Sequence, residues 1–131
     1  MWPRVDGLRG LELGSPGELR RRLTNLVLAG EKTATAGLLA EYTDEGEELE
    51  HVGERLALID DDGTRAATVE ITAIAVVPFA EVPFAFALDE GEGYTSIEHW
   101  REAHARFWAG EGTRVDDATE IACLRFHVVR T

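Results

Sequence analysis

Cysteine, lysine and long apolar segments are what this sequence has least of. A single cysteine, Cys123, excludes an internal disulfide and any metal site built from several cysteines. No apolar segment approaches the roughly 18 residues of a membrane-spanning helix, and residues 1–6 lack the apolar core of a signal peptide. We therefore expect a cytoplasmic protein that does not span a membrane.

The length of 131 residues predicts one domain over residues 1–131. A chain of this size buries roughly two thirds of the surface that its unfolded form exposes, so it can build a core without disulfides. Cys123 falls within an apolar strand pattern, and we interpret it as a small buried strand residue.

Basic residues are also scarce. The chain has 25 acidic and 13 basic residues, for a formal net charge of −12. Such a charge repels long duplex nucleic acid and anionic membranes at long range. The composition therefore favours a nucleoside, a nucleotide or a short single strand, bound in a cleft whose local charge differs from that of the whole.

The one lysine, Lys32, stands in the segment Gly30–Thr35, while arginine supplies every other cationic side chain. A generic surface charge does not need a lysine, whereas a site that uses a compact ammonium with three donors does. Two interpretations remain open, a functional lysine and an exposed cation at a helix end.

The first part of the chain predicts one helix. Residues 1–14 are expected to be irregular. Ser15, Pro16 and Glu18 are typical of a capped helix start, and Gly30 is typical of a helix end. Arginines 20–22 fall mostly on the outer face, where they form a solvated surface or a path for phosphate.

The middle of the chain predicts a hairpin. Residues 33–35 are expected to be extended, 37–42 to form a helical turn and 43–50 to form a solvated acidic loop. Two β-rich segments, 55–60 and 65–77, flank a turn. In the second segment one face is expected to carry Val69, Ile71, Ala73 and Ala75. The expected core residues after it are Phe79, Val82, Phe84, Phe86 and Leu88.

The last part predicts an acidic loop, a helix and a strand. The loop covers residues 89–94, Thr95 and Glu98 are expected to cap a helix over 96–108, and residues 119–130 alternate as a strand. The element order lacks a βαβ rhythm. We therefore predict an α+β fold, with a small antiparallel β-barrel and flanking α-helices.

Two stretches carry a family resemblance. Residues 23–39, LTNLVLAGEKTATAGLL, and residues 89–107, DEGEGYTSIEHWREAHARF, resemble in order and spacing the two signatures of a bacterial ASCH domain subgroup, within the PUA-like superfamily. The resemblance implies a PUA-like barrel with a cleft beside the first motif, and roles centred on RNA or modified nucleosides. Some small bacterial members are amidohydrolases of N4-acylated cytidine, and others are reported as ribonucleases.

The amidohydrolase branch implies a catalytic set of Lys32, Thr35 and Glu92, with Glu90 as the alternative to Glu92. A threonine nucleophile needs a base, which a neutral Lys32 would supply. Alternatively a charged Lys32 holds an anionic oxygen or a phosphate while Glu92 moves the proton. The residues leave both assignments open.

Further side chains are candidates for the cleft wall. Trp100 and His104 lie one helical turn apart, so they either line a base pocket or pack in the core. His99 and His104 are five residues apart, which is the wrong spacing for a shared metal on one helix, and we expect neither a metal nor a cofactor. The candidate ligand-binding residues are Glu90, Tyr94, Ser96, Trp100, Arg101 and His104.

Three functions follow from this reading. The first is binding of RNA or a modified nucleoside around Lys32, with amide hydrolysis of the N4-acylcytidine type. The second is metal-independent RNA cleavage at the same site. The third is a non-catalytic RNA- or nucleotide-binding regulatory module, in which Lys32 contacts an anion.

Overall fold

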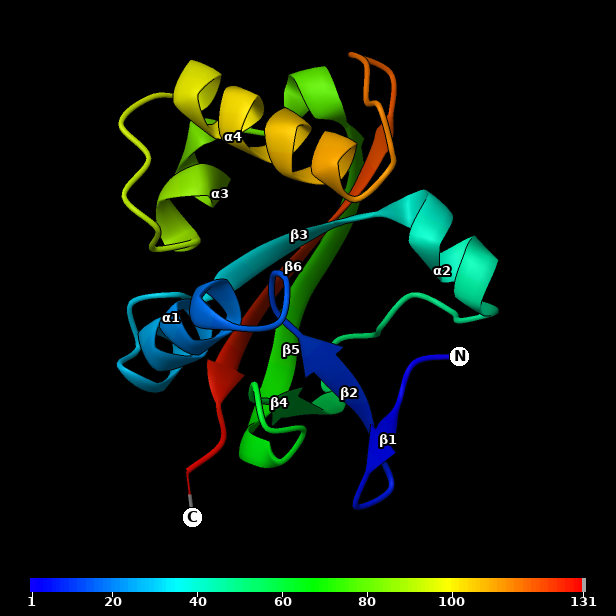
Figure 1. The fold of residues 1–131 in the computed structure, drawn as a ribbon, viewed down its shortest axis with the longest axis vertical. Coiled ribbons are helices and arrows are strands. Elements are labelled where there is room, and N and C mark those ends of the chain that lie inside the picture. The colour runs from blue at the N-terminus through cyan, green and yellow to red at the C-terminus, as the bar shows by residue number, and fades with distance from the viewer. Residues whose placement is uncertain (131) are drawn as a thin grey trace.

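The computed structural model describes residues 1–130 and has a mixed α+β architecture (Figure 1). The strands are β1 (Arg4–Val5), β2 (Leu8–Glu12), β3 (Ala34–Leu38), β4 (Arg55–Ile59), β5 (Arg65–Pro78) and β6 (Glu120–Val128). The helices are α1 (Glu18–Leu28), α2 (Leu39–Glu45), α3 (Phe84–Asp89) and α4 (Ile97–Gly110), with a 3-10 turn at Phe79–Glu81.

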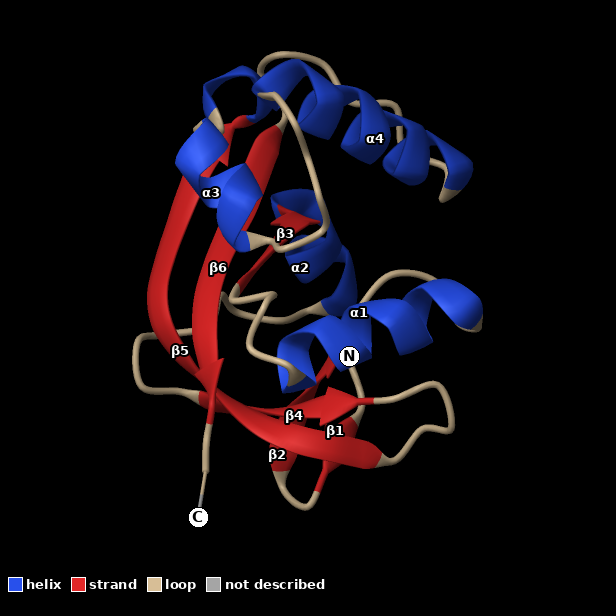
Figure 2. Ribbon diagram, turned by 90° about the vertical axis from the view of Figure 1, so that its left-hand side faces the viewer, coloured by secondary structure: helices blue, strands red, loops and turns tan. Residues whose placement is uncertain are grey.

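The six strands form one open sheet in the order β1-β2-β4-β5-β6-β3. The α+β class is confirmed, but the prediction of a closed barrel is wrong, because β1 and β3 remain two separate edges. The sheet is also not purely antiparallel, since β2 pairs in parallel with β4. Figure 2 shows β5 and β6 as long curved strands, with α1 and α4 projecting on either side of β3.

Residues 1–14 are not irregular, because β1 and β2 lie there. Gly10, which interrupts the apolar pattern, permits the close approach of β2 to β4. A Cβ at this position would lie 2.4 Å from Cδ1 of Ile59. Gly10 therefore leaves room for the side chain of Ile59 beside β2.

The predicted hairpin is confirmed as β4 and β5. A β-bulge follows Ile71, which pairs with Phe126, while Ala73 pairs with the preceding Arg125. The extra residue reverses the alternation of faces. The predicted grouping of residues on one face of β5 therefore holds for Val69 and Ile71 and fails after the bulge, where Ile74 packs against the same apolar cluster.

Two apolar clusters meet opposite faces of β6, because consecutive residues of a strand point to opposite sides. Cys123 belongs to the cluster under α4, as a buried apolar residue, and Leu124 belongs to the cluster under α1. The α4 cluster includes Phe79, Val82, Phe86, Trp100, Trp108 and Ile121, and the α1 cluster includes Leu23, Val27, Leu56, Leu58, Val69 and Phe126. Leu88 was expected in the core but is 55% exposed, since it lies on the outer side of the short α3.

Two charged residues are more buried than the patterns predict. The segment 43–50 was expected to be a solvated loop, but α2 extends to Glu45, and Glu50 is buried against the hydroxyl of Tyr42. Arg20 was expected on an outer face, but its guanidinium donates to the carbonyls of Leu13 and Gly14. It thereby ties α1 to the end of β2.

The start of α1 differs from the predicted capping box. The helix begins at Glu18 after Gly17, which has φ 106°, and no side chain caps it. The amide of Gly17 instead donates to Asp61 in the hairpin turn, so a distant contact replaces the local one. Within residues 1–130, no helix combines the length and the apolar character that crossing a membrane requires.

Arg20→Ala tests the buried guanidinium. The substitution leaves two carbonyls of the chain without their charged donor, and we expect a loss of about 3 kcal/mol in the free energy of unfolding, measured by urea denaturation. Arg21→Ala is the matched control, because Arg21 is 59% exposed in its ion pair with Asp61, and we expect it to cost less than about 1 kcal/mol. Equal losses in the two variants would contradict the assignment.

Candidate functional site

The end of α1 buries Lys32. Gly30 takes φ 78°, and the amides of Glu31 and Lys32 both donate to the carbonyl of Leu26. This reversal at the predicted helix end turns the chain inward into β3. Lys32 consequently lies 2% exposed, so the interpretation as an exposed cation is wrong.

The acidic loop after α3 is fastened directly against the Lys32 segment. The carbonyl of Asp89 accepts from the amide of Thr33 at 2.8 Å and from its hydroxyl at 3.3 Å. Gly91 has φ 68°, and a Cβ there would lie 2.1 Å from the carbonyl oxygen of Glu31. Only glycine permits this approach, which brings residues 90 and 92 to either side of Lys32.

The Lys32 ammonium forms an ion pair with Glu92. Its Nζ lies 2.7 Å from Oε2 of Glu92 and 3.5 Å from the backbone carbonyl of Glu90. The hydroxyl of Tyr94 donates to the other carboxylate oxygen of Glu92 at 3.2 Å. Burial, together with the negative charges of Glu92 and Glu90, raises the pKa of Tyr94, so this hydroxyl keeps its proton.

Glu90 faces the other way and joins two residues of α4. Its Oε2 accepts from Nε1 of Trp100 at 2.8 Å and lies 3.2 Å from Nε2 of His104. Burial alone would raise the pKa of Glu90, but the hydrogen bond from His104, the charge of Lys32 and the Trp100 donor together lower it. Nδ1 of His104 lies 3.0 Å from the carbonyl of Trp100. Both ring nitrogens therefore face acceptor oxygens.

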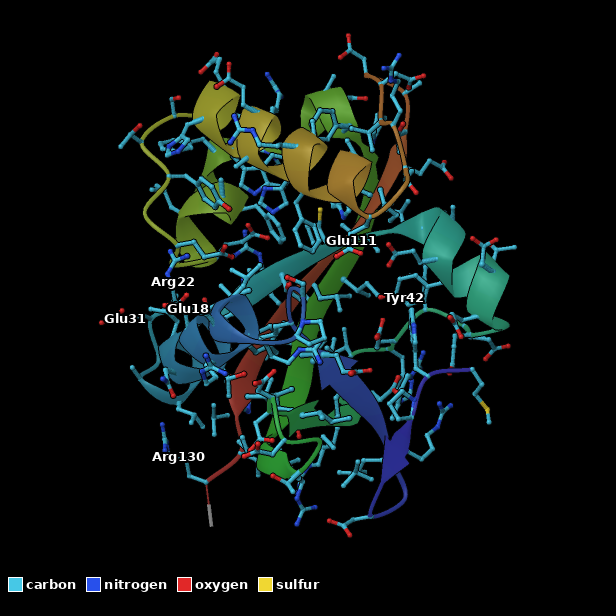
Figure 3. The ribbon with its side chains drawn as sticks, viewed as in Figure 1. Glu18, Arg22, Glu31, Tyr42, Glu111 and Arg130 are labelled. Atoms are coloured by element: carbon cyan, nitrogen blue, oxygen red, sulfur yellow. The ribbon has the colours of Figure 1, made fainter. Side chains whose placement is uncertain are left out.

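These groups surround a cavity of about 240 Å³ that we call the site cavity. Its polar lining comes from the end of α1, from β3, from the acidic loop and from α4. The side chains concerned are Lys32, Thr35, Glu90, Glu92, Tyr94 and His104. Arg22 of α1 also lines it and donates to the carbonyl of Glu92 at 3.4 Å, on the left in Figure 3. No hydrogen bond joins the hydroxyl of Thr35 to Lys32 or Glu92 within the described chain.

Three of the predicted wall residues do not line this cavity. Trp100 is fully buried and stacks under His104 with ring centroids 4.1 Å apart. Ser96 is the N-cap of α4 and accepts from the amide of His99, so it caps the helix in place of Thr95. Arg101 donates to the carbonyl of Ala80. In each case the side chain stabilises the structure around the cavity and does not line the cavity.

Sequence reasoning missed one contributor to the site and left a second one open. Gly91 was counted only as part of an acidic loop, although its close approach positions both glutamates. Arg22 was expected on a solvated surface or on a path for phosphate, and it lines the cavity. Among residues 1–130, no three His, Cys, Asp or Glu side chains form a group suited to a metal.

Comparison with known proteins adds the family. The family model described as the ASCH domain matches residues 11–130. The chain belongs to the ASCH domain family. This family is generally linked to RNA binding. Among curated proteins, none matches the sequence.

Two solved structures resemble this ASCH domain closely. Protein EF3133 from Enterococcus faecalis V583 is 30% identical with a TM-score of 0.81, covering 92% of this chain and 75% of that one. The ASCH domain from Lactobacillus crispatus JV V101 is 28% identical with a TM-score of 0.79, covering 91% of this chain and 77% of that one. The predicted family is therefore confirmed, together with a PUA-like fold.

Gly91→Ala tests how the acidic loop is held. The new Cβ overlaps the carbonyl of Glu31, so the loop must move away from Lys32, and we expect a clear fall in melting temperature. Gly93→Ala is the matched control, because Gly93 also has a positive φ, of 87°, but nothing lies within 4 Å of its Cβ position. It should cost only the about 1–2 kcal/mol of a left-handed alanine. Similar losses for both variants would contradict the close-packed arrangement.

The pH dependence of stability tests Glu90. Its pKa is lower in the folded state than the about 4.3 of an unfolded glutamate, so ionised Glu90 stabilises the fold above that pH. This contribution is lost as the pH falls from about 4.3 through the lower folded pKa. We expect Glu90→Gln to melt below the wild type at pH 7, with the difference shrinking toward pH 3. A constant difference across this range would refute the assignment.

Proposed function

We propose that this ASCH domain binds a nucleoside-sized ligand in the site cavity and hydrolyses an amide on it, in the manner of an N4-acylcytidine amidohydrolase. The observation that carries the proposal is the buried Lys32–Glu92 ion pair, which lines a cavity together with Thr35. A buried ion pair costs desolvation free energy that a structural role does not require. A cation and a carboxylate held side by side are, however, what acyl transfer to water needs.

The geometry favours water as the nucleophile. A threonine nucleophile needs a base within hydrogen-bond reach, and the hydroxyl of Thr35 has no such bond to Lys32 or Glu92. Glu92 takes a proton from a bound water, whose oxygen attacks the amide carbon. The Lys32 ammonium stabilises the resulting oxyanion. Glu92 then returns the proton to the leaving nitrogen, and the C–N bond breaks to give a carboxylic acid and an amine.

The remaining residues support this division of labour. Tyr94 donates to Glu92 and orients its carboxylate. The Glu90–His104 pair adjoins the Lys32–Glu92 pair, because Nζ of Lys32 also lies 3.5 Å from the backbone carbonyl of Glu90. Thr35 on β3 is available to donate a hydrogen bond to the substrate. A net charge of −12 makes a long RNA backbone a poor occupant.

Turnover of N4-acetylcytidine in the presence of EDTA tests the proposal, with cytidine release followed by mass spectrometry. We expect Glu92→Gln and Lys32→Met to lose at least about 100-fold in kcat, the usual scale for a lost acid–base or oxyanion group. Arg21→Ala, which alters a charge outside the cavity, should retain the wild-type rate.

Two outcomes would redirect the assignment. Lys32-dependent fragments from a short single-stranded RNA would favour ribonuclease activity. Binding of RNA or nucleotide without any product would favour a non-catalytic module. Thr35→Val distinguishes the two nucleophiles, because a water mechanism retains measurable turnover in that variant and a threonine nucleophile does not.

A further inference from the structure

A second, larger cavity of about 440 Å³ adjoins the site cavity. The two share part of their walls, including Thr35 and Ala36 of β3 and Phe107 and Trp108 of α4. Figure 3 shows Tyr42 and Glu111 toward the right of the molecule, on the side away from Arg22. A ligand seated at Lys32 therefore has a neighbouring chamber, with Thr35 at the boundary.

Carboxylates dominate the polar lining of this second cavity. Glu12, Glu41, Glu50 and Glu111 all line it, and the one cationic side chain among the lining residues is Arg20. Arg20 has no nitrogen to spare, because its Nε and one terminal nitrogen donate to backbone carbonyls and the other meets Glu12 at 3.2 Å. Arg20 therefore neutralises Glu12 alone, and Glu41, Glu50 and Glu111 have no counter-charge among the lining residues.

Glu50 is the most informative of these carboxylates. It is 6% exposed, and the hydroxyl of Tyr42, 2.8 Å from Oε1, is the one side chain of residues 1–130 that donates to it. No lysine, arginine or histidine of the described chain forms an ion pair with it, since the nearby Arg9 is held by Glu47 and Glu54. Burial raises the pKa of Glu50, against the opposing effects of the Tyr42 bond, a hydrogen bond from its own backbone and the Arg9 charge. Glu50 is thus a buried carboxylate that has hydrogen-bond donors but no cation beside it in an ion pair, and a cationic ligand would supply one.

Aromatic rings complete the chamber. Trp2 meets Tyr42 edge-on with ring centroids 4.8 Å apart, and Phe107 and Trp108 face the cavity from α4. Aromatic faces beside carboxylates form the environment that binds organic cations. Neutral or anionic ligands gain little from it.

We propose that this second cavity is a binding site for an organic cation, an ammonium or guanidinium group on an apolar stem, which Glu50 holds. The cation supplies the charged donor that Glu50 lacks and rests against the aromatic walls. If the protein hydrolyses amides bound in the site cavity, the acyl group of the substrate extends into the second cavity. The second cavity then favours substrates whose acyl group ends in such a cation. This extension rests on the function proposed above, whereas the cation site itself does not.

Titration with benzylamine and with its neutral isostere benzyl alcohol tests the site. Amide chemical shifts of 15N-labelled protein in 150 mM salt report where and how tightly each binds. We expect benzylamine to shift the amides of Thr35–Gly37 and of residues 41–50, and benzyl alcohol to bind at least about tenfold more weakly, the value of one charge-assisted contact. Equal affinity for both probes, or shifts spread over the acidic surface, would overturn the proposal.

Three variants sharpen the test. Glu50→Gln keeps an acceptor for Tyr42 but removes the buried charge. We expect this variant to bind benzylamine about tenfold more weakly than the wild type and to have a higher melting temperature at pH 7. Glu48→Gln removes the same charge from an exposed neighbour, and it should change neither the affinity for benzylamine nor the melting temperature. Lys32→Met should bind benzylamine like the wild type, so a failure of the hydrolytic proposal leaves this result intact. Undiminished binding to Glu50→Gln would refute the cation site.

The extension has its own readout. N4-(6-aminohexanoyl)cytidine and N4-heptanoylcytidine differ only in a terminal ammonium in place of a methyl. We expect the wild type to prefer the amino compound in kcat/KM, and Glu50→Gln to lose that preference with kcat for N4-acetylcytidine unchanged. Equal kcat/KM for the two compounds would refute the extension.

Discussion

The ion pair between Lys32 and Glu92 is the contact on which the site depends. A lysine at 2% exposure is tolerable only with a carboxylate beside it, because an isolated buried ammonium costs several kcal/mol. That requirement explains the backbone around it. The helix reversal at Gly30 delivers the lysine, and the close approach at Gly91 delivers the glutamate. The Asp89–Thr33 hydrogen bonds hold the two segments together.

The sequence was sufficient to predict those helix ends and turns that depend on interactions between neighbouring residues. The helix end at Gly30, the hairpin and the start of α4 were predictable within a few residues, because glycine conformation, turn chemistry and capping act over short distances. Contacts between distant segments were not. The parallel pairing of β2 with β4, the bulge after Ile71 and the burial of Arg20 depend on partners that no local pattern identifies.

The two glutamates of the acidic loop illustrate the same limit at the site. From sequence, Glu90 and Glu92 were equivalent candidates two residues apart. The positive φ of Gly91 separates them, so that one faces Lys32 and the other faces His104 and Trp100. The same α4 pattern placed Trp100 either in the core or in a base pocket. The structure buries it beneath His104, where it supports a residue that lines the cavity. The sequence was sufficient to identify candidate functional side chains, but not the side chains that each of them contacts.

The contacts that hold the acidic loop also limit how far it can move. A lid that opens and closes needs a segment free to swing about a hinge. Residues 89–92 lack that freedom, since Asp89 is bonded to Thr33 and Gly91 touches the backbone of Glu31. The rest of the cavity lining comes from α1, β3 and α4, which Figure 2 shows around the loop, so the ligand proposed above would enter without movement of residues 89–92. The acidic loop thus forms a fixed wall of the site cavity, and it holds Glu90 and Glu92 in place beside Lys32.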